Sequence, residues 1–243
     1  MSGLVCEVEA TSPVALVRLA GRLDPAADVD LRTTLQKALV EQPSGIVVDV
    51  AGLTFWDDLT LMVFSRFAST AAEWSACPMV VCAPSALLWS ALKRLAITQT
   101  VGVYPTRAQA VVAVEAAAAR RVRQRLSATP AAPALARRTV VEACQAWGLP
   151  DLVDDAEVVV TELVANAVRH VGGDLHLDIA LGQRFLHLSL RDGSRVAPVR
   201  KLPDPDTGRG GRGLILIDAL AASWGSTLTL EGKAVWARLR LPG

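Results

Sequence analysis

Residues 127–133 interrupt the hydrophobic pattern of this 243-residue chain. The segment from Ser127 to Pro133 combines two prolines with small residues and has neither helical nor strand periodicity. This composition is typical of a linker. A chain of this length has room for two domains of ordinary size. We therefore predict a first domain over residues 1–126, a linker over residues 127–133 and a second domain over residues 134–243.

The first half alternates short apolar runs with helical patterns. The run from Gly45 to Val50 is β-branched without alternation, which is typical of a strand buried on both faces. Strands that alternate with helices favour an α/β layer structure. The predicted strands are residues 14–19, 45–50, 79–83 and 101–104, and the predicted helices are residues 26–41, 59–72, 85–95 and 106–126.

The second half begins again with helical periodicity and continues with paired strand-like runs. A short turn containing glycine joins the first two runs, as in a hairpin. A long loop then precedes another helix and two final strands. The predicted elements are helices 134–147 and 154–170, strands 175–181 and 185–191, the loop 192–213, and strands 226–230 and 234–241. We expect α/β folds in both halves: a mixed sheet with helices first, then an α/β sandwich.

The charge distribution excludes nucleic acid as a direct partner. The net charge is +1 and the acidic and basic residues nearly cancel in each half. Basic residues cluster only at Arg120, Arg121, Arg123 and Arg125. We interpret this cluster as the solvated C-terminal end of the helix 106–126, where cations interact favourably with the helix dipole.

Cysteine usage and hydropathy favour a cytoplasmic protein. Cys6, Cys77, Cys82 and Cys144 have no CxxC spacing and no nearby histidine, so we expect reduced thiols and no zinc site. The N-terminus lacks the basic-then-apolar pattern of a signal peptide. No apolar run reaches the ~18 residues that a membrane span needs.

Three polar residues share one face of the helix predicted over residues 154–170. Glu162, Asn166 and His170 are spaced by four, so they form one stripe on an otherwise apolar helix. Such a stripe is usually just the solvated face. Asn166, however, lies between two alanines in the middle of a helix, where asparagine has poor propensity.

Two further features suit a phosphate-bearing ligand. The loop from Thr207 to Leu214 contains glycines at 208, 210, 211 and 213 and leads directly into a helix, which allows backbone N–H groups to surround an anion. Arg209 and Arg212 could add charge there. Asp192-Gly193 ends a strand, where a carboxylate can accept a hydrogen bond from the amino group of adenine. A flexible surface loop and a common turn are the plain alternatives.

The order of these features resembles the GHKL-type ATPase and kinase fold. The run from Val160 to His170 (VTELVANAVRH) is similar to that family's N-box, in the form found in bacterial anti-sigma-factor serine kinases. The similarity extends through residues 211–214, 222–225 and 232–236. It implies ATP and Mg²⁺ as ligands, with Asn166 holding Mg²⁺, Glu162 as general base and Asp192 with Gly193 at the adenine. The implied lid residues are Gly208, Arg209, Gly210, Gly211, Arg212 and Gly213.

One position departs from that family. Many relatives carry Asp-x-Gly-x-Gly at the adenine box, whereas this chain continues from Asp192 to Arg195 as Asp-Gly-Ser-Arg. For His170 we expect a structural or phosphate-side contact. A sensor histidine kinase is disfavoured because His176 and His187, the other histidines, lie on predicted strands.

Residues 4–115 resemble a STAS domain, the fold of anti-anti-sigma factors. The match is the run from Val47 to Asp57 (VVDVAGLTFWD), which leads to that family's phosphorylation site. The family pattern there is Asp-Ser-Ser-Gly-Leu, but this chain has Asp57 and Asp58 before Leu59 and Thr60. Leucine therefore takes the acceptor position, and Asp58 supplies a fixed negative charge beside it. Helix capping by the two aspartates is the plain alternative.

Together the two resemblances imply a bacterial partner-switching regulator. A STAS-like domain would be fused to an ATP-dependent serine/threonine kinase that acts on a sigma factor or a STAS-domain antagonist. Related kinases are often dimers, so a homodimer stays open. The main alternative is a non-catalytic scaffold that sequesters such a partner. A larger ATP-driven machine lacks the additional domains that such proteins use.

Overall fold

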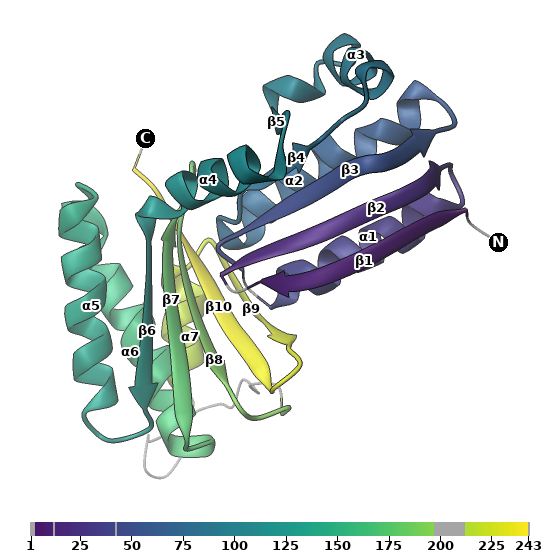
Figure 1. The fold of residues 1–243 in the computed structure, drawn as a ribbon. Coiled ribbons are helices and arrows are strands. Elements are labelled where there is room, and N and C mark those ends of the chain that lie inside the picture. Colours follow the sequence, from purple (N-terminus) through teal and green to yellow (C-terminus); the bar gives the residue numbers. More distant parts are fainter. Residues whose placement is uncertain (1–2, 12, 42, 197–211, 243) are drawn as a thin grey trace. The chain divides into compact units, whose positions relative to one another are not determined.

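The computed structural model describes residues 3–11, 13–41, 43–196 and 212–242. The chain divides into two compact units, Met1–Ala119 and Arg120–Gly243. Each unit contains one five-stranded sheet and its own hydrophobic core (Figure 1). The predicted fold class, α/β in both halves, is confirmed.

The N-terminal sheet has the strand order β1-β2-β3-β4-β5, so neighbours in sequence are neighbours in space. The hairpin of β1 (Leu4–Thr11) and β2 (Val14–Leu23) is antiparallel. The strands β3 (Gly45–Phe55), β4 (Met79–Cys82) and β5 (Gly102–Tyr104) join in parallel. The sheet is therefore mixed, as predicted, although the prediction omitted β1 and ended β3 five residues early.

Helices cover both faces of this sheet (Figure 1). The helices α1 (Ala27–Val40), α2 (Met62–Ser75) and α3 (Ala86–Arg94) bury their apolar side chains in the main core. On the opposite face, α4 (Arg107–Ala117) covers a smaller cluster. Its buried members are Val14, Leu16, Val47, Val80, Cys82, Ala110 and Val114.

The C-terminal sheet is antiparallel throughout and has the strand order β6-β7-β8-β10-β9. Three helices pack on one face of it and form a two-layer α/β sandwich (Figure 1). The strands are β6 (Arg121–Ser127), β7 (Asp174–Leu181), β8 (Phe185–Asp192), β9 (Ser223–Leu228) and β10 (Lys233–Arg240). The helices are α5 (Ala132–Ala146), α6 (Val153–His170) and α7 (Arg212–Leu220).

The interpretation of residues 120–126 as a helix end is wrong. The helix α4 stops at Ala117, and residues 121–127 form β6, an edge strand of the C-terminal sheet. The side chains of Arg121 and Arg123 donate from Nε to Asp178 of β7 at 2.9 Å, and Arg121 and Asp178 are almost fully buried. A buried carboxylate requires such partners. The arginine cluster therefore joins two strands.

The seam between the units also differs from the prediction. The residues of β6 belong to the C-terminal unit, and α5 begins at Ala132 with Pro133 in its first turn. Proline suits that position because its missing N–H would have no helical acceptor there. Only residues 128–131 of the predicted linker lie outside regular structure.

Within the described ranges, none of the helices has the length and apolarity to span a bilayer.

Candidate nucleotide site

The helix α6 places Glu162 and Asn166 on one half-exposed stripe. The two residues are four apart, so they stack one helical turn from each other. The other face of α6 is buried in the core by Val159, Val160, Leu163, Val164 and Ala167. This burial fixes the rotation of the helix about its axis. It therefore fixes the direction in which Glu162 and Asn166 project.

The start of α7 lies against this stripe. A side chain at Gly213 would collide with the carboxylate of Glu162, and its Cβ would stand 3.5 Å from Nδ2 of Asn166. Glycine lets the start of α7 approach Glu162 without displacing its carboxylate, and the N-terminal N–H groups of a helix favour anions. The structure thus brings together three of the predicted site residues: Glu162, Asn166 and Gly213.

Glu162 has one charged neighbour on its own helix. The guanidinium of Arg169 lies 3.8 Å from the carboxylate of Glu162, and the Arg169 side chain is half exposed. An ion pair of this exposure and length contributes little to stability. Glu162 can therefore exchange this partner for another at low cost.

Asp192 ends β8 as a buried carboxylate. It lies two residues after Leu190, a core residue under the helices, so its side chain projects to the same face of the sheet as α6. Its Oδ1 accepts hydrogen bonds from the ammonium of Lys233 at 2.8 Å and from the backbone N–H of Ser194 at 2.9 Å. The predicted adenine acceptor is thus already part of an ion pair.

Lys233 is the residue that the sequence reasoning missed. It pairs directly with Asp192 across the β8–β10 ladder and is followed by Val235, Ala237 and Leu239, all buried in the core. Because side chains alternate along a strand, Lys233 occupies a core-facing position. In the sequence, Lys233 stands at the same alternate positions as the apolar residues that follow it, and this pattern was the available sign that Lys233 faces the core.

The β9–β10 hairpin closes over the end of β8. A side chain at Gly232 would collide with the backbone of Asp192 and Gly193, and the guanidinium of Arg195 donates to the carbonyl of Leu230 at 2.9 Å. The segment that departs from the usual adenine box is therefore fixed by contacts of its own. At Gly193 itself, a Cβ would meet nothing within 4 Å.

Of the remaining predicted residues, some lie outside the part of the chain that the structure describes. Gly208, Arg209, Gly210 and Gly211 of the predicted lid lie outside the described residues. Arg212 is the first residue of α7. The exposed His170 is the last residue of α6, two turns beyond Glu162.

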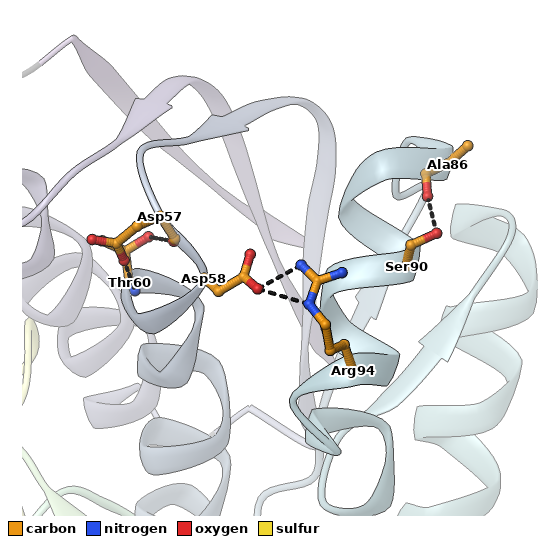
Figure 2. Close-up of polar contacts among 6 residues, drawn as sticks. All are labelled: Asp57, Asp58, Thr60, Ala86, Ser90 and Arg94. Atoms are coloured by element: carbon orange, nitrogen blue, oxygen red, sulfur yellow. Dashed lines mark hydrogen bonds and ion pairs between the residues drawn. The ribbon is translucent and has the colours of Figure 1, made fainter.

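The N-terminal candidate residues form a compact turn at the start of a 3₁₀ helix, Asp58–Leu61, that leads into α2 (Figure 2). Asp57 caps this helix: its carboxylate accepts the backbone N–H of Thr60 at 3.0 Å. The Thr60 hydroxyl donates to the carbonyl of Asp57 at 2.7 Å. The carboxylate of Asp58 instead points to α3, where Nε of Arg94 donates to it at 2.9 Å (Figure 2).

Two large apolar side chains flank this turn and are exposed. Leu59, at the acceptor position of the resembled family, is 73% exposed, and Trp56 is 61% exposed. The guanidinium of Arg22 lies 4.3 Å from the centre of the Trp56 ring, a cation–π contact. The acceptor position is therefore accessible, but its side chain has no hydroxyl.

Comparison with known proteins assigns the C-terminal unit. The C-terminal unit is a helix-covered antiparallel sheet in which the polar stripe of α6 lies beside the N-terminus of α7. Residues 126–239 match the family model described as a histidine kinase-like ATPase domain. The C-terminal unit thus carries an ATPase domain of this kind. A comparison with curated proteins finds no significant match.

Solved structures similar to the chain align over its N-terminal half. An anti-sigma factor antagonist from Mycobacterium paratuberculosis is 19% identical, with 46% of this chain and 94% of that chain covered and a TM-score of 0.42. SpoIIAA in its unphosphorylated form is 18% identical over 46% of this chain and 97% of that one, with a TM-score of 0.40. An anti-sigma-factor antagonist (STAS) domain protein from Planctomyces limnophilus is 18% identical over 45% and 96%, with a TM-score of 0.39.

The side chains of the C-terminal site fit a magnesium nucleotide. Mg²⁺ is usually bound by one or two protein oxygens together with substrate phosphates and water. Asn166 offers a carboxamide oxygen beside Glu162 and the start of α7. In the described part of the chain, no three His, Cys, Asp or Glu residues are grouped so as to hold a metal ion.

Proposed function

We propose that the chain is a partner-switching regulator whose C-terminal domain binds ATP with Mg²⁺ and phosphorylates a protein serine or threonine. The observation that carries the proposal is the meeting of Glu162, Asn166 and Gly213 at the N-terminus of α7. The match of residues 126–239 to the histidine kinase-like ATPase family supports ATP as the ligand.

Each residue has a role that follows from its chemistry. ATP supplies the phosphoryl group, and phosphoryl transfer requires mainly a metal, positioning and a base. The amide oxygen of Asn166 is suited to hold Mg²⁺. The carboxylate of Glu162 accepts the proton of the substrate hydroxyl, for which it exchanges its weak contact with Arg169. Asp192 accepts the amino group of adenine through its carboxylate.

The N-terminal unit is proposed as a STAS-like docking domain. Its partner would be a sigma factor or a STAS-domain antagonist, and the site of action the cytoplasm. Leu59 has no hydroxyl, and the hydroxyl of Thr60 donates to the backbone. We therefore assign this turn to docking rather than to phosphorylation. Because Arg94 offsets the charge of Asp58, the exposed Trp56 and Leu59 are the main contact residues of this proposal.

A non-catalytic scaffold is the second candidate, and one observation favours it. Lys233 occupies one oxygen of Asp192, the predicted adenine acceptor. A site already satisfied in this way could bind ATP weakly and still hold a protein partner. The two candidates make different predictions. The kinase needs Asn166 to bind Mg²⁺ with ATP and Glu162 to transfer phosphate, whereas the scaffold needs neither residue to hold its partner.

Calorimetric titration of the full chain with ATP and Mg²⁺ tests the proposal. We expect saturable, Mg²⁺-dependent binding by the wild type and at least a ~100-fold loss in Asn166→Ala, because the metal loses its protein ligand. The matched control is Gln145→Ala, which removes a carboxamide from the exposed side of α5. This control should bind as the wild type does. Equal binding by wild type and Asn166→Ala would favour the scaffold.

A further inference from the structure

The buried pair of Asp192 and Lys233 requires an explanation beyond stability. Their side chains are only 3% and 7% exposed, and their charged atoms are 2.8 Å apart. Burying two charges carries a large desolvation cost, and an apolar pair of similar volume is often at least as stable. Lysine is also among the residues least often found fully buried. A functional reason for the pair is therefore worth seeking.

The hydrogen bonds of the pair are unevenly distributed. Oδ1 of Asp192 accepts both Lys233 and the backbone of Ser194. Among the described residues, no hydrogen bond reaches Oδ2 of Asp192, and the ammonium of Lys233 has no acceptor other than Asp192. An ammonium carries three donors. The pair therefore keeps a free acceptor beside free donors, on the sheet face that α6 covers.

This arrangement complements one edge of adenine. Adenine carries a donor, the 6-amino group, next to an acceptor, the ring nitrogen N1. Hypoxanthine has the opposite order, with a carbonyl oxygen at position 6 and an N–H at position 1. A site built of fixed polar groups rejects an analogue of reversed polarity strongly, because its buried groups lose their partners.

We propose that Lys233 is a base-reading residue: Asp192 accepts the 6-amino group of adenine through Oδ2 while Lys233 donates to N1. The inference rests on the proposed function and assigns its base specificity. The ion pair holds the carboxylate in the orientation that leaves Oδ2 open. Lys233 thus contacts the ligand and also positions Asp192.

The test compares ATP with ITP, which differ only at this edge of the base. Both are titrated calorimetrically with Mg²⁺ into the full-length wild type and the Lys233→Met variant. We expect the wild type to prefer ATP by about 10- to 100-fold, the discrimination typical of one bidentate base contact. In Lys233→Met the affinity for ATP should fall by that factor, while the affinity for ITP changes by no more than about threefold.

Two further variants keep the test decisive. Lys37→Met removes an exposed lysine from α1 and should leave both affinities unchanged. Should Lys233→Met fail to fold because Asp192 is left without its cation, the double variant Asp192→Leu with Lys233→Met removes both charges. That double variant should fold and bind ATP and ITP equally.

The outcomes separate the two proposals. If the wild type binds neither nucleotide, the proposed function is wrong and this inference falls with it. If the wild type binds ATP and Lys233→Met keeps the wild-type preference over ITP, only this inference is overturned. Equal losses for ATP and ITP also overturn it, because Lys233 would then serve the fold or the parts that both nucleotides share.

Discussion

The N-terminal turn and the Glu162–Asn166 stripe of α6 use their polar side chains in opposite ways. In the N-terminal turn the three polar side chains each have a partner: Asp57 caps a helix, Thr60 donates to the backbone, and Asp58 pairs with Arg94. On the stripe of α6, within the described residues, Asn166 has no hydrogen bond and Glu162 has only the distant Arg169 as a charged partner. Groups that are satisfied internally stabilise the fold, whereas groups left open are available to a ligand.

The largest expected effect comes from giving the N-terminal turn the acceptor hydroxyl that Leu59 lacks. We predict that Leu59→Ser makes position 59 an accessible substrate for the C-terminal domain, since Leu59 is 73% exposed. Adding Glu162→Gln should lower the rate of phosphorylation at this position by about 10²–10⁴, the usual contribution of a general base. ATP affinity should change less than about threefold. Mass spectrometry with Mg²⁺ and ATP measures the phosphate.

The parent chain, with leucine at position 59, is the control and should acquire no phosphate there. Equal phosphorylation rates with and without Glu162→Gln would remove Glu162 from the role of base. Absence of phosphate at position 59 in the Leu59→Ser chain would contradict the prediction that the C-terminal domain accepts a serine there.

Two buried thiols allow the halves to be compared in one experiment. Cys82 of the N-terminal unit and Cys144 of the C-terminal unit are both fully buried. Burial raises the pKa of Cys82 to about 11 and also raises the pKa of Cys144. The reactive thiolate is the minor form below the pKa, so at pH 8 only ~10⁻³ of native Cys82 is ionised even before steric protection. Labelling of either thiol therefore reports opening of its own unit.

We predict that Mg²⁺ and ATP at 100 times the dissociation constant slow labelling of Cys144 about 100-fold. This factor follows from stabilisation of the native state by about 2.7 kcal/mol. Labelling of Cys82 should not change, because the nucleotide binds the other unit. Peptide mass spectrometry after a thiol reagent distinguishes the positions. Equal protection of both thiols would show that the units open together, and no protection of Cys144 would argue against nucleotide binding.

Local patterns predicted most of the helices and strands but not the pairs that join them. The amphipathic pattern of α6 is local, so Glu162 and Asn166 could be placed on one stripe from sequence. The strand β6 could not be recognised, because Arg121 and Arg123 are explained by Asp178 and Arg125 by Asp174, all about fifty residues away. Tertiary pairing overrides local propensity in such segments.

The same limit applies to the sites. Asp192 was found by its position after a strand, but Lys233 lies 41 residues further on, and only the β8–β10 register brings them together. Likewise, the fixed charge expected at Asp58 is offset by Arg94, 36 residues away. Sequence motifs indicated the candidate groups, whereas long-range partners decide how each group is satisfied.

The smallest expected effect separates the two aspartates of the N-terminal turn. Asp57→Ala removes a helix cap and should lower the free energy of unfolding by about 1 kcal/mol. Asp58→Ala removes an exposed ion pair and should cost no more than about 0.5 kcal/mol. Urea unfolding of the full chain, followed through the N-terminal thiol Cys82, measures both.

Partner binding should rank the same two variants in the opposite order. Asp58 stands next to the exposed Leu59 and pairs with Arg94 of α3, so its loss alters the proposed docking surface. Asp57 instead caps the helix of the turn and is not part of that surface. The control variant Arg94→Met breaks the same ion pair from the other side. It should match Asp58→Ala in stability, because the two changes remove one interaction. If Asp58→Ala proves the more destabilising change, the turn is held by its contact to α3 rather than by its cap, and the N-terminal site is structural throughout.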